Sequence, residues 1–225
     1  MLLGEAVVAI WNGITDEGRA AFYAWHVTEH IPERIGIPGF LRGRRYRATD
    51  TKTHPEFFTL YEVETFAVTT SQAYLDRLNN PTPWTKTATA AFRDTSRGAC
   101  HVIKSVGPGS GGNLATIRFD VGSGKEQAAK AALSDLVQSL SRLPQVTGAH
   151  IAATDLDASG VKTAESKGRS DIQAPPNWFV LIETCTAERL KEPIEKILRS
   201  EFVQTPNVGL YVLEYARLRT DHDRG

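Results

Sequence analysis

The feature that most constrains the fold of this chain is an internal repetition. Three pairs of segments match: 57–62 with 178–183, 48–50 with 153–155, and 7–11 with 114–118. Self-similarity along a chain is typical of a repeated structural unit. We therefore predict two homologous halves, with this division: a first repeat at 1–106, a Gly-rich linker at 107–112, a second repeat at 113–220 and a tail at 221–225.

Each half reads as strand, helix, strand, strand, helix, strand. In the first half we expect strands at 6–11, 40–49, 57–64 and 99–106, a helix after a cap at Thr15 that Pro32 bends or ends, a helix at 66–78, and an irregular piece around Trp84. In the second half we expect strands at 114–121, 146–154, 178–184 and 208–218, and helices at 125–141 and 187–200. The polar insertion at 156–177 is typical of a mobile surface loop or lid.

This order of elements is ferredoxin-like, βαββαβ, in each half. Such a unit has a four-stranded antiparallel sheet with helices on one face, so its other, partly apolar face needs a partner. We predict an α+β fold in which two tandem ferredoxin-like repeats pack sheet to sheet as an α/β barrel within one chain.

Composition excludes several classes of function. The 26 Lys and Arg balance the 26 Asp and Glu, so no long-range field attracts nucleic acid or an anionic membrane. Cys100 and Cys185 are too few for a disulfide framework, which favours a cytoplasmic location. The first residues show neither a signal peptide nor a spanning helix, so we expect no membrane partner.

The sequence resembles one known superfamily. Residues 23–33 read Tyr-Ala-Trp-His-Val-Thr-Glu-His-Ile-Pro-Glu, and Pro38-Gly39-Phe40 and Arg44-Arg45-Tyr46 follow. This stretch is similar to the dimeric α/β-barrel superfamily, closest to its EthD-like members. The resemblance implies a barrel of two ferredoxin-like units with pockets between a helix layer and its sheet. Members include cofactor-free monooxygenases, lactone isomerases, haem-handling enzymes and proteins without established activity, so it implies the fold and leaves the reaction open.

The candidate catalytic residues are His30, His26 and Glu29. The two histidines lie four residues apart and share a helical face, and imidazole exchanges protons near neutral pH. His30 is the candidate acid or base, oriented by Glu29 or Glu62; the alternatives are that His30 only caps the helix, with His26 exposed, or that His30 ligates haem. His-x-x-Glu-His is also a zinc-peptidase spelling, but Pro32 follows at once, so we expect no metal site.

The candidate substrate-binding residues are aromatic or cationic. They are Trp25, Arg44, Tyr46, Tyr61 and Trp84. Arg44 beside Tyr46 suits an anionic substrate, because guanidinium binds carboxylates well. The alternative for this arginine is a cross-strand ion pair with Glu62 or Glu64. Trp84, in a Pro-rich stretch, is the candidate for a pocket mouth.

These observations favour a small-organic-molecule binding protein. The resemblance implies, for an enzyme, a cofactor-independent monooxygenase or isomerase of aromatic or carbonyl compounds; the alternatives are a non-catalytic stress-associated or assembly barrel, and haem binding. The expected partner is a small-molecule ligand, without nucleic acid, membrane or cofactor. The expected assembly is a monomeric pseudo-dimer or a homodimer.

Overall fold

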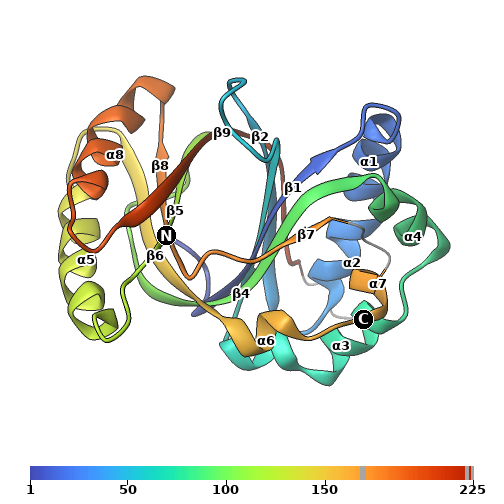
Figure 1. Ribbon diagram of the computed structural model, residues 1–225. Coiled ribbons are helices and arrows are strands. Elements are labelled where there is room, and N and C mark those ends of the chain that lie inside the picture. Colours follow the sequence, from blue (N-terminus) through green and yellow to red (C-terminus); the bar gives the residue numbers. More distant parts are fainter. Residues whose placement is uncertain (168–170, 221–222, 224–225) are drawn as a thin grey trace.

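Eight strands close into one antiparallel barrel in the computed structural model, which describes residues 1–167, 171–220 and 223 (Figure 1). The strands are β1 Ala6–Ile14, β2 Phe40–Ala48, β3 Phe57–Val63, β4 Phe92–Val106, β5 Asn113–Asp120, β6 Val146–Asp155, β8 Trp178–Thr184 and β9 Gln204–Leu218. A short β7, Ile172–Gln173, adds to β4 in parallel. The predicted α+β barrel is confirmed; 168–170 of the predicted loop, and 221–222 and 224–225 of the predicted tail, lie outside the described residues.

The barrel consists of two four-stranded sheets joined at their edges. The strand order is β4-β1-β3-β2 in the first half and β9-β5-β8-β6 in the second. When the strands of each half are numbered along the chain, both orders read 4-1-3-2. Antiparallel pairing of β2 with β9 and of β4 with β6 joins the halves. An unpaired sheet edge leaves backbone donors and acceptors open, so closing the barrel removes four such edges.

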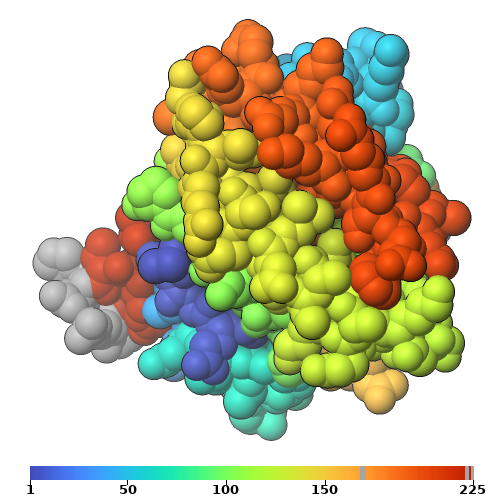
Figure 2. Space-filling view, turned by 90° about the vertical axis from the view of Figure 1, so that its left-hand side faces the viewer, coloured from blue at the N-terminus to red at the C-terminus, as the bar shows by residue number. Residues whose placement is uncertain are grey.

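Helices cover two opposite sides of the barrel (Figure 1). The first half contributes α1 Arg19–Trp25, α2 Ile31–Gly36, α3 Gln72–Asn79 and α4 Pro83–Ala90, and the second half contributes α5 Glu126–Leu140 and α8 Lys191–Leu198. Figure 2 shows α5 and α8 side by side on one face. Single 3₁₀ turns, Phe66–Thr70 and Ala187–Leu190, precede α3 and α8. No helix in the described ranges combines the length and the apolarity needed to cross a bilayer.

Helix α4 lies where the sequence predicted an irregular piece, so that expectation was wrong. Thr82 caps this helix, because its Oγ1 accepts a hydrogen bond from the backbone N–H of Thr85 at 2.9 Å. Pro83 follows in the first turn, where a missing N–H costs nothing. The Pro-rich stretch is therefore a helix start.

The first predicted helix is interrupted by a π-helical turn, His26–His30, between α1 and α2. The N–H of Ile31 bonds to the carbonyl oxygen of His26, five residues earlier. Pro32 explains this widening, because its ring has no N–H and crowds the carbonyl four residues before it. The helix also begins later than predicted: Thr15 lies in the preceding turn, and α1 starts at Arg19.

The barrel interior contains an aromatic core from both halves. The Trp11 ring lies 4.8 Å from that of Phe58 and 5.4 Å from that of Phe179, measured between centroids. All three side chains are buried. The inner faces of the two sheets therefore pack on each other, as the sequence predicted.

Buried charges fill another part of the interior. Arg44 lies 2.9 Å from a carboxylate oxygen of Glu62 and 2.9 Å from one of Glu183, and all three side chains are at most 1% exposed. His150 Nε2 lies 3.3 Å from Glu183. Burial raises the pKa of Glu183, but the hydrogen bond from His150 and the charge of Arg44 outweigh it and bring that pKa to about 2. The Gly-rich 107–112 segment also contacts this cluster, because the N–H of Gly111 donates to Glu183 at 3.0 Å.

Candidate functional site

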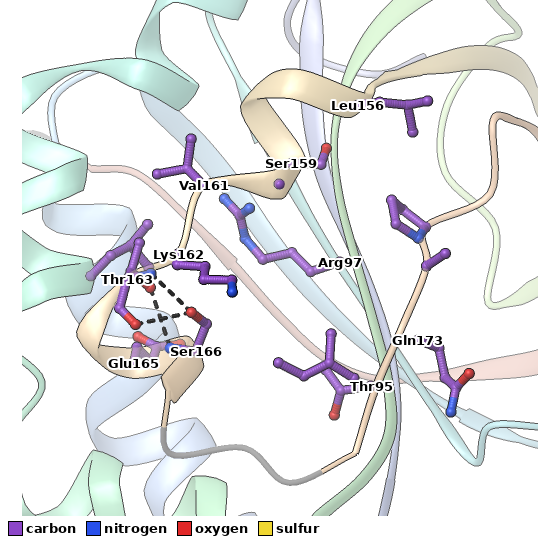
Figure 3. Close-up of a pocket in the computed structure, with 15 residues that line it drawn as sticks. Thr95, Arg97, Leu156, Ser159, Val161, Lys162, Thr163, Glu165, Ser166 and Gln173 are labelled. Carbon is purple, nitrogen blue, oxygen red and sulfur yellow. Dashed lines mark hydrogen bonds between the residues drawn. The ribbon is translucent and has the colours of Figure 1, made fainter.

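A cavity of about 300 Å³ opens between β4 and the 156–175 part of the insertion (Figure 3). Its walls come from α3, β4 and the insertion, with these lining residues: Leu78, Thr95, Arg97, Leu156, Ser159, Gly160, Val161, Lys162, Thr163, Glu165, Ser166, Ile172, Gln173, Ala174 and Pro175. The first half has no equivalent of this insertion. The cavity lies on the helix side of the first-half sheet. Among the described residues the second half has no matching cavity wall, because the insertion that forms it occurs once.

The described part of the insertion is ordered by its own short elements, α6 Leu156–Gly160 and α7 Ala164–Lys167, and by β7. The Ser159 hydroxyl accepts a hydrogen bond from the Ala99 N–H of β4 at 2.9 Å. Farther along, Ser96 of β4 donates to the carbonyl oxygen of Ala174 at 3.2 Å. These bonds fasten the insertion to β4 and leave the cavity between them.

Two cationic side chains line the cavity, the exposed Lys162 and the less exposed Arg97 of β4. The Arg97 side chain extends from β4 toward the insertion (Figure 3), and its Nη2 donates to the Tyr74 hydroxyl at 3.0 Å. The guanidinium carbon lies 5.6 Å from the centre of the Tyr74 ring. Among the described residues no carboxylate lies within ion-pair distance of Arg97. Burial lowers the pKa of Arg97, but Tyr74 and Glu165 outweigh it and raise the pKa above its ordinary value, so the side chain stays charged.

Thr95 lies two residues before Arg97 on β4, so both side chains point to the same face of the sheet. The Thr95 side chain is 1% exposed, and its hydroxyl has no hydrogen-bond partner among the described residues. A buried hydroxyl without a hydrogen-bond partner lowers the free energy of unfolding, so such groups are rare in folded proteins. Together the two residues offer an unused donor and a positive charge to one cavity.

An ion pair between Glu165 of α7 and Arg34 of α2 connects the cavity wall to the helix layer. Both side chains are buried, at 7% and 2% exposure. Arg34 also lies 3.0 Å from Glu33, which in turn pairs with Arg77 of α3. Glu165 is therefore the contact through which the insertion is fixed to α2.

We expect Glu165→Gln to loosen the insertion. The change leaves Glu33 as the carboxylate partner of Arg34 among the described residues, at a cost of about 1–3 kcal/mol for the unmatched charge. Trypsin should then cleave after Lys162 and Lys167 several-fold faster than in the unmodified protein. Glu192→Gln, which removes a solvent-exposed pair with Lys196 on α8, is the matched control. Equal cleavage rates in both variants would contradict this role of Glu165.

The structure brings five of the predicted site residues together, between the helix layer and the outer face of the first-half sheet. They are Trp25, His26, Glu29, His30 and Tyr61. The His30 ring lies 4.2 Å from Trp25, 5.5 Å from His26 and 6.4 Å from Tyr61, between centroids. Glu29 accepts hydrogen bonds from Trp25 Nε1 at 3.2 Å, from Thr82, which caps α4, and from Thr85 of α4.

His26 is 3% exposed, so the alternative in which it faces solvent was wrong. Burial, and then the neighbouring charges of Arg45 and Arg34, hold the pKa of His26 well below its ordinary value. Arg45 Nη1 lies 3.5 Å from His26 Nδ1. His26 is therefore a neutral imidazole stacked 4.9 Å from Phe22.

This neutral histidine predicts a pH dependence of stability. The unfolded state binds a proton below about pH 6.5 while folded His26 does not, so the free energy of unfolding falls as pH drops below that value, by at most about 1.4 kcal/mol per pH unit. His150, whose pKa burial also lowers, adds a second such contribution. In urea titrations at pH 7.5 and 5.5, His26→Phe should lose about 1 kcal/mol less than the unmodified protein. An unchanged loss, equal to that of the exposed-site control His101→Asn, would contradict the assignment.

The other three predicted residues lie apart from this group. Arg44 and Tyr46 point into the barrel, where Arg44 forms the ion pair with Glu62 that was the alternative for it. Burial raises the pKa of Tyr46, and its hydroxyl, like that of Tyr61, has no partner among the described residues. Trp84 lies on α4, 38% exposed. None of the eight predicted residues lines the cavity.

Sequence reasoning identified the insertion as a loop or lid but missed Arg97 and Thr95 as site residues. The predicted strand began at residue 99, whereas β4 begins at Phe92, so Thr95 and Arg97 were left in an irregular piece. Alternation along β4, with Thr95 and Arg97 on one face, was the signal that could have found them.

The residues around His30 do not fit a haem. Trp25, His26 and Tyr61 surround the imidazole, His30 is 4% exposed, and it does not line the cavity. A haem bound through this imidazole would have to displace those side chains. Within the described ranges, no three His, Cys, Asp or Glu side chains gather closely enough to hold a metal ion.

Comparisons with known proteins agree on the fold. No family model and no curated protein sequence matches the chain. Among solved structures, a candidate monooxygenase from Lactobacillus acidophilus NCFM is 12% identical, with 96% of this chain and 97% of that chain covered and a TM-score of 0.58. An anthrone oxidase-like protein is 9% identical, with 96% of this chain and 93% of that chain covered and a TM-score of 0.59. A heme-binding protein from Thermus thermophilus is 11% identical, with 94% of this chain and 92% of that chain covered and a TM-score of 0.51. This chain is thus a ferredoxin-like α/β barrel, the fold it shares with these proteins.

Proposed function

We propose that the protein binds a small organic molecule in the cavity between β4 and the insertion, with Arg97 and Thr95 holding its anionic or carbonyl oxygen. The observation that carries the proposal is that, within the described part of the chain, one face of β4 presents both an arginine without a carboxylate partner and a buried hydroxyl without a hydrogen-bond partner. Arg97 has no carboxylate partner among the described residues, and the Thr95 hydroxyl has no hydrogen-bond partner there. An oxyanion satisfies both, because guanidinium and hydroxyl donors bind it through charge-assisted hydrogen bonds.

The size and surface of the cavity restrict the ligand. A volume of about 300 Å³ is at the lower limit of the roughly 300–1,000 Å³ that small-molecule pockets span. Apolar side chains make up much of its wall: Leu78, Leu156, Val161, Ile172 and Pro175. An aromatic compound of one to three rings with a single oxygen-bearing group suits this combination.

For catalysis we propose cofactor-independent oxygenation by dioxygen, or isomerisation, of an aromatic or carbonyl compound. Both reactions begin with transfer of a proton from the substrate to solvent water in the open cavity, which leaves negative charge on a phenolate or enolate oxygen. A preorganised cation at that oxygen stabilises the charge as it develops. Arg97 supplies this cation. The support from comparison is the printed names of two structural neighbours, a candidate monooxygenase and an anthrone oxidase-like protein.

His30, His26 and Glu29 have a different place in this proposal. They lie outside the cavity lining, in a buried aromatic stack behind α2. Arg34 of α2 binds Glu165 of the lining, and α2 follows directly on the π-helical turn His26–His30. We propose that these residues hold the helical wall of the cavity in place.

We also propose that the two halves are copies of one ferredoxin-like unit, so that the chain is a pseudo-dimer. Arg44 lies opposite Leu60, and His150 lies opposite Leu181, at the same register of the two sheets. Each of these basic residues contacts a glutamate two positions beyond that leucine. Equivalent positions thus carry an arginine or histidine beside a glutamate in both halves.

Calorimetric titration of the protein with three matched probes tests the binding proposal. We expect 2-naphthoate to bind most tightly, 2-naphthol more weakly and naphthalene weakest, because only the first brings a full negative charge to Arg97. Incubation with anthrone under dioxygen, followed by mass spectrometry, tests turnover. No binding of any probe, or equal affinity for naphthoate and naphthalene, would contradict the proposal.

A further inference from the structure

Three exposed apolar side chains surround the entrance of the cavity. Of the eight large apolar side chains that are exposed among the described residues, Leu156, Val161 and Ile172 line the cavity, at 55%, 52% and 57% exposure. A side chain that lines a cavity and is also more than half exposed lies at its mouth. These three come from separate places in the insertion: α6, the turn after it, and β7.

Buried polar side chains line the deeper part of the cavity. Thr95 is 1% exposed and Thr163 is 6% exposed, and Arg97 lies beside Thr95 on β4. The two threonine hydroxyls are thus at the closed end, together with the buried Leu78, whereas the three exposed apolar side chains are at the open end. Lys162 follows Val161 in sequence and is exposed at the mouth. Its carbon stem adds apolar surface there, while its charge stays in water.

We infer that the natural ligand is amphipathic, with an oxyanion head in the cavity and an alkyl or acyl chain that leaves through the mouth and lies on Leu156, Val161 and Ile172. This inference rests on the proposed function and names its substrate class. A cavity of about 300 Å³ holds a compound of one to three rings with its head group, so a chain that extends beyond that size has to continue over the mouth. Large apolar side chains kept in water cost free energy, and a ligand chain that covers them explains their concentration here.

A series of 4-alkylbenzoates, from methyl to octyl, tests this by calorimetric titration of the whole protein. Inside the cavity each added methylene should tighten Kd about fourfold, the equivalent of about 0.8 kcal/mol for a fully buried group. Over the half-exposed mouth the gain should be about twofold per methylene and should persist through the longer members.

The double variant Val161→Ser/Ile172→Ser should remove the gain from the longer members, so that Kd no longer falls with chain length beyond the shortest members of the series. Leu198→Ser, at an exposed leucine of α8 on the opposite side of the barrel, is the matched control and should keep the chain-length dependence (Figure 1). Circular dichroism melts establish that each variant folds.

The outcomes separate the two claims. Binding of 4-methylbenzoate with an affinity that stops rising beyond the shortest chains, or a chain-length gain that survives in the double variant, would overturn the amphipathic ligand and leave the binding site standing. Absence of binding by every member, with or without a chain, would remove the proposed function and this inference with it.

Discussion

Arg44→Met should lower the free energy of unfolding by about 3–5 kcal/mol, the cost of breaking a buried ion pair from one side. Arg44 is 1% exposed and lies between Glu62 and Glu183, which are equally buried. Without its guanidinium, two carboxylates from opposite halves of the barrel lose their shared counter-charge. Glu62 keeps Arg42, and Glu183 keeps His150, which is why the loss should stay within this range.

Urea unfolding followed by circular dichroism measures this effect. Arg47→Met is the matched control, because Arg47 is on the same strand and also pairs with a glutamate, Glu214, at 2.8 Å, but is 49% exposed. Its loss should be below about 1 kcal/mol. If Arg44→Met does not fold, Arg44→Met/Glu183→Leu should recover stability, since an apolar pair replaces the orphaned carboxylate. A loss in Arg44→Met equal to that in Arg47→Met would show that the buried charges do not hold the halves together.

Arg97→Gln should weaken 2-naphthoate binding by about 10- to 150-fold, the equivalent of the 1.5–3 kcal/mol that hydrogen bonds to charged groups contribute. Glutamine keeps a donor near Tyr74 but removes the positive charge. Affinity for naphthalene should change by less than about twofold, because that probe makes no use of the charge. The difference between the two probes therefore isolates the electrostatic part of binding.

Arg93→Gln is the control for this variant, since Arg93 is an exposed arginine of the same strand whose Nη1 donates to the carbonyl oxygens of Ala90 and Phe92. It should leave both affinities unchanged. Equal weakening of naphthoate and naphthalene in Arg97→Gln would mean that the residue shapes the cavity without recognising an anion.

The strands and the barrel could be predicted because they follow from local alternation. Phe57–Val63 and Trp178–Thr184 carry the same pattern, and the inward side chains Phe58 and Phe179 meet in the core as an apolar layer requires. Arg44 and Tyr46 share one face for the same reason, two residues apart. Alternation does not say which face becomes the barrel interior, so these two residues were grouped with the helix-layer histidines that lie on the other side of the sheet.

The cavity could not be predicted, because its wall is an insertion with no periodicity. Residues 156–175 are mostly polar, and what orders the described part is contact with β4 and with Arg34, far away in sequence. The π-helical turn was also beyond reach: Pro32 predicts a disturbance, but only packing decides between an ended helix and a widened one. Contacts between residues far apart in sequence determine both the cavity wall and the π-helical turn, and the local sequence pattern does not reveal such contacts.

The location of the ligand is the central claim, and a crystal structure of the protein soaked with 2-naphthoate tests it most directly. We predict density for the ring between β4 and the 156–175 segment, with the carboxylate within hydrogen-bond distance of Arg97 and the Thr95 hydroxyl. Density for the ring beside His30 and Tyr61, inside the barrel near Arg44, or nowhere in the protein would contradict the account.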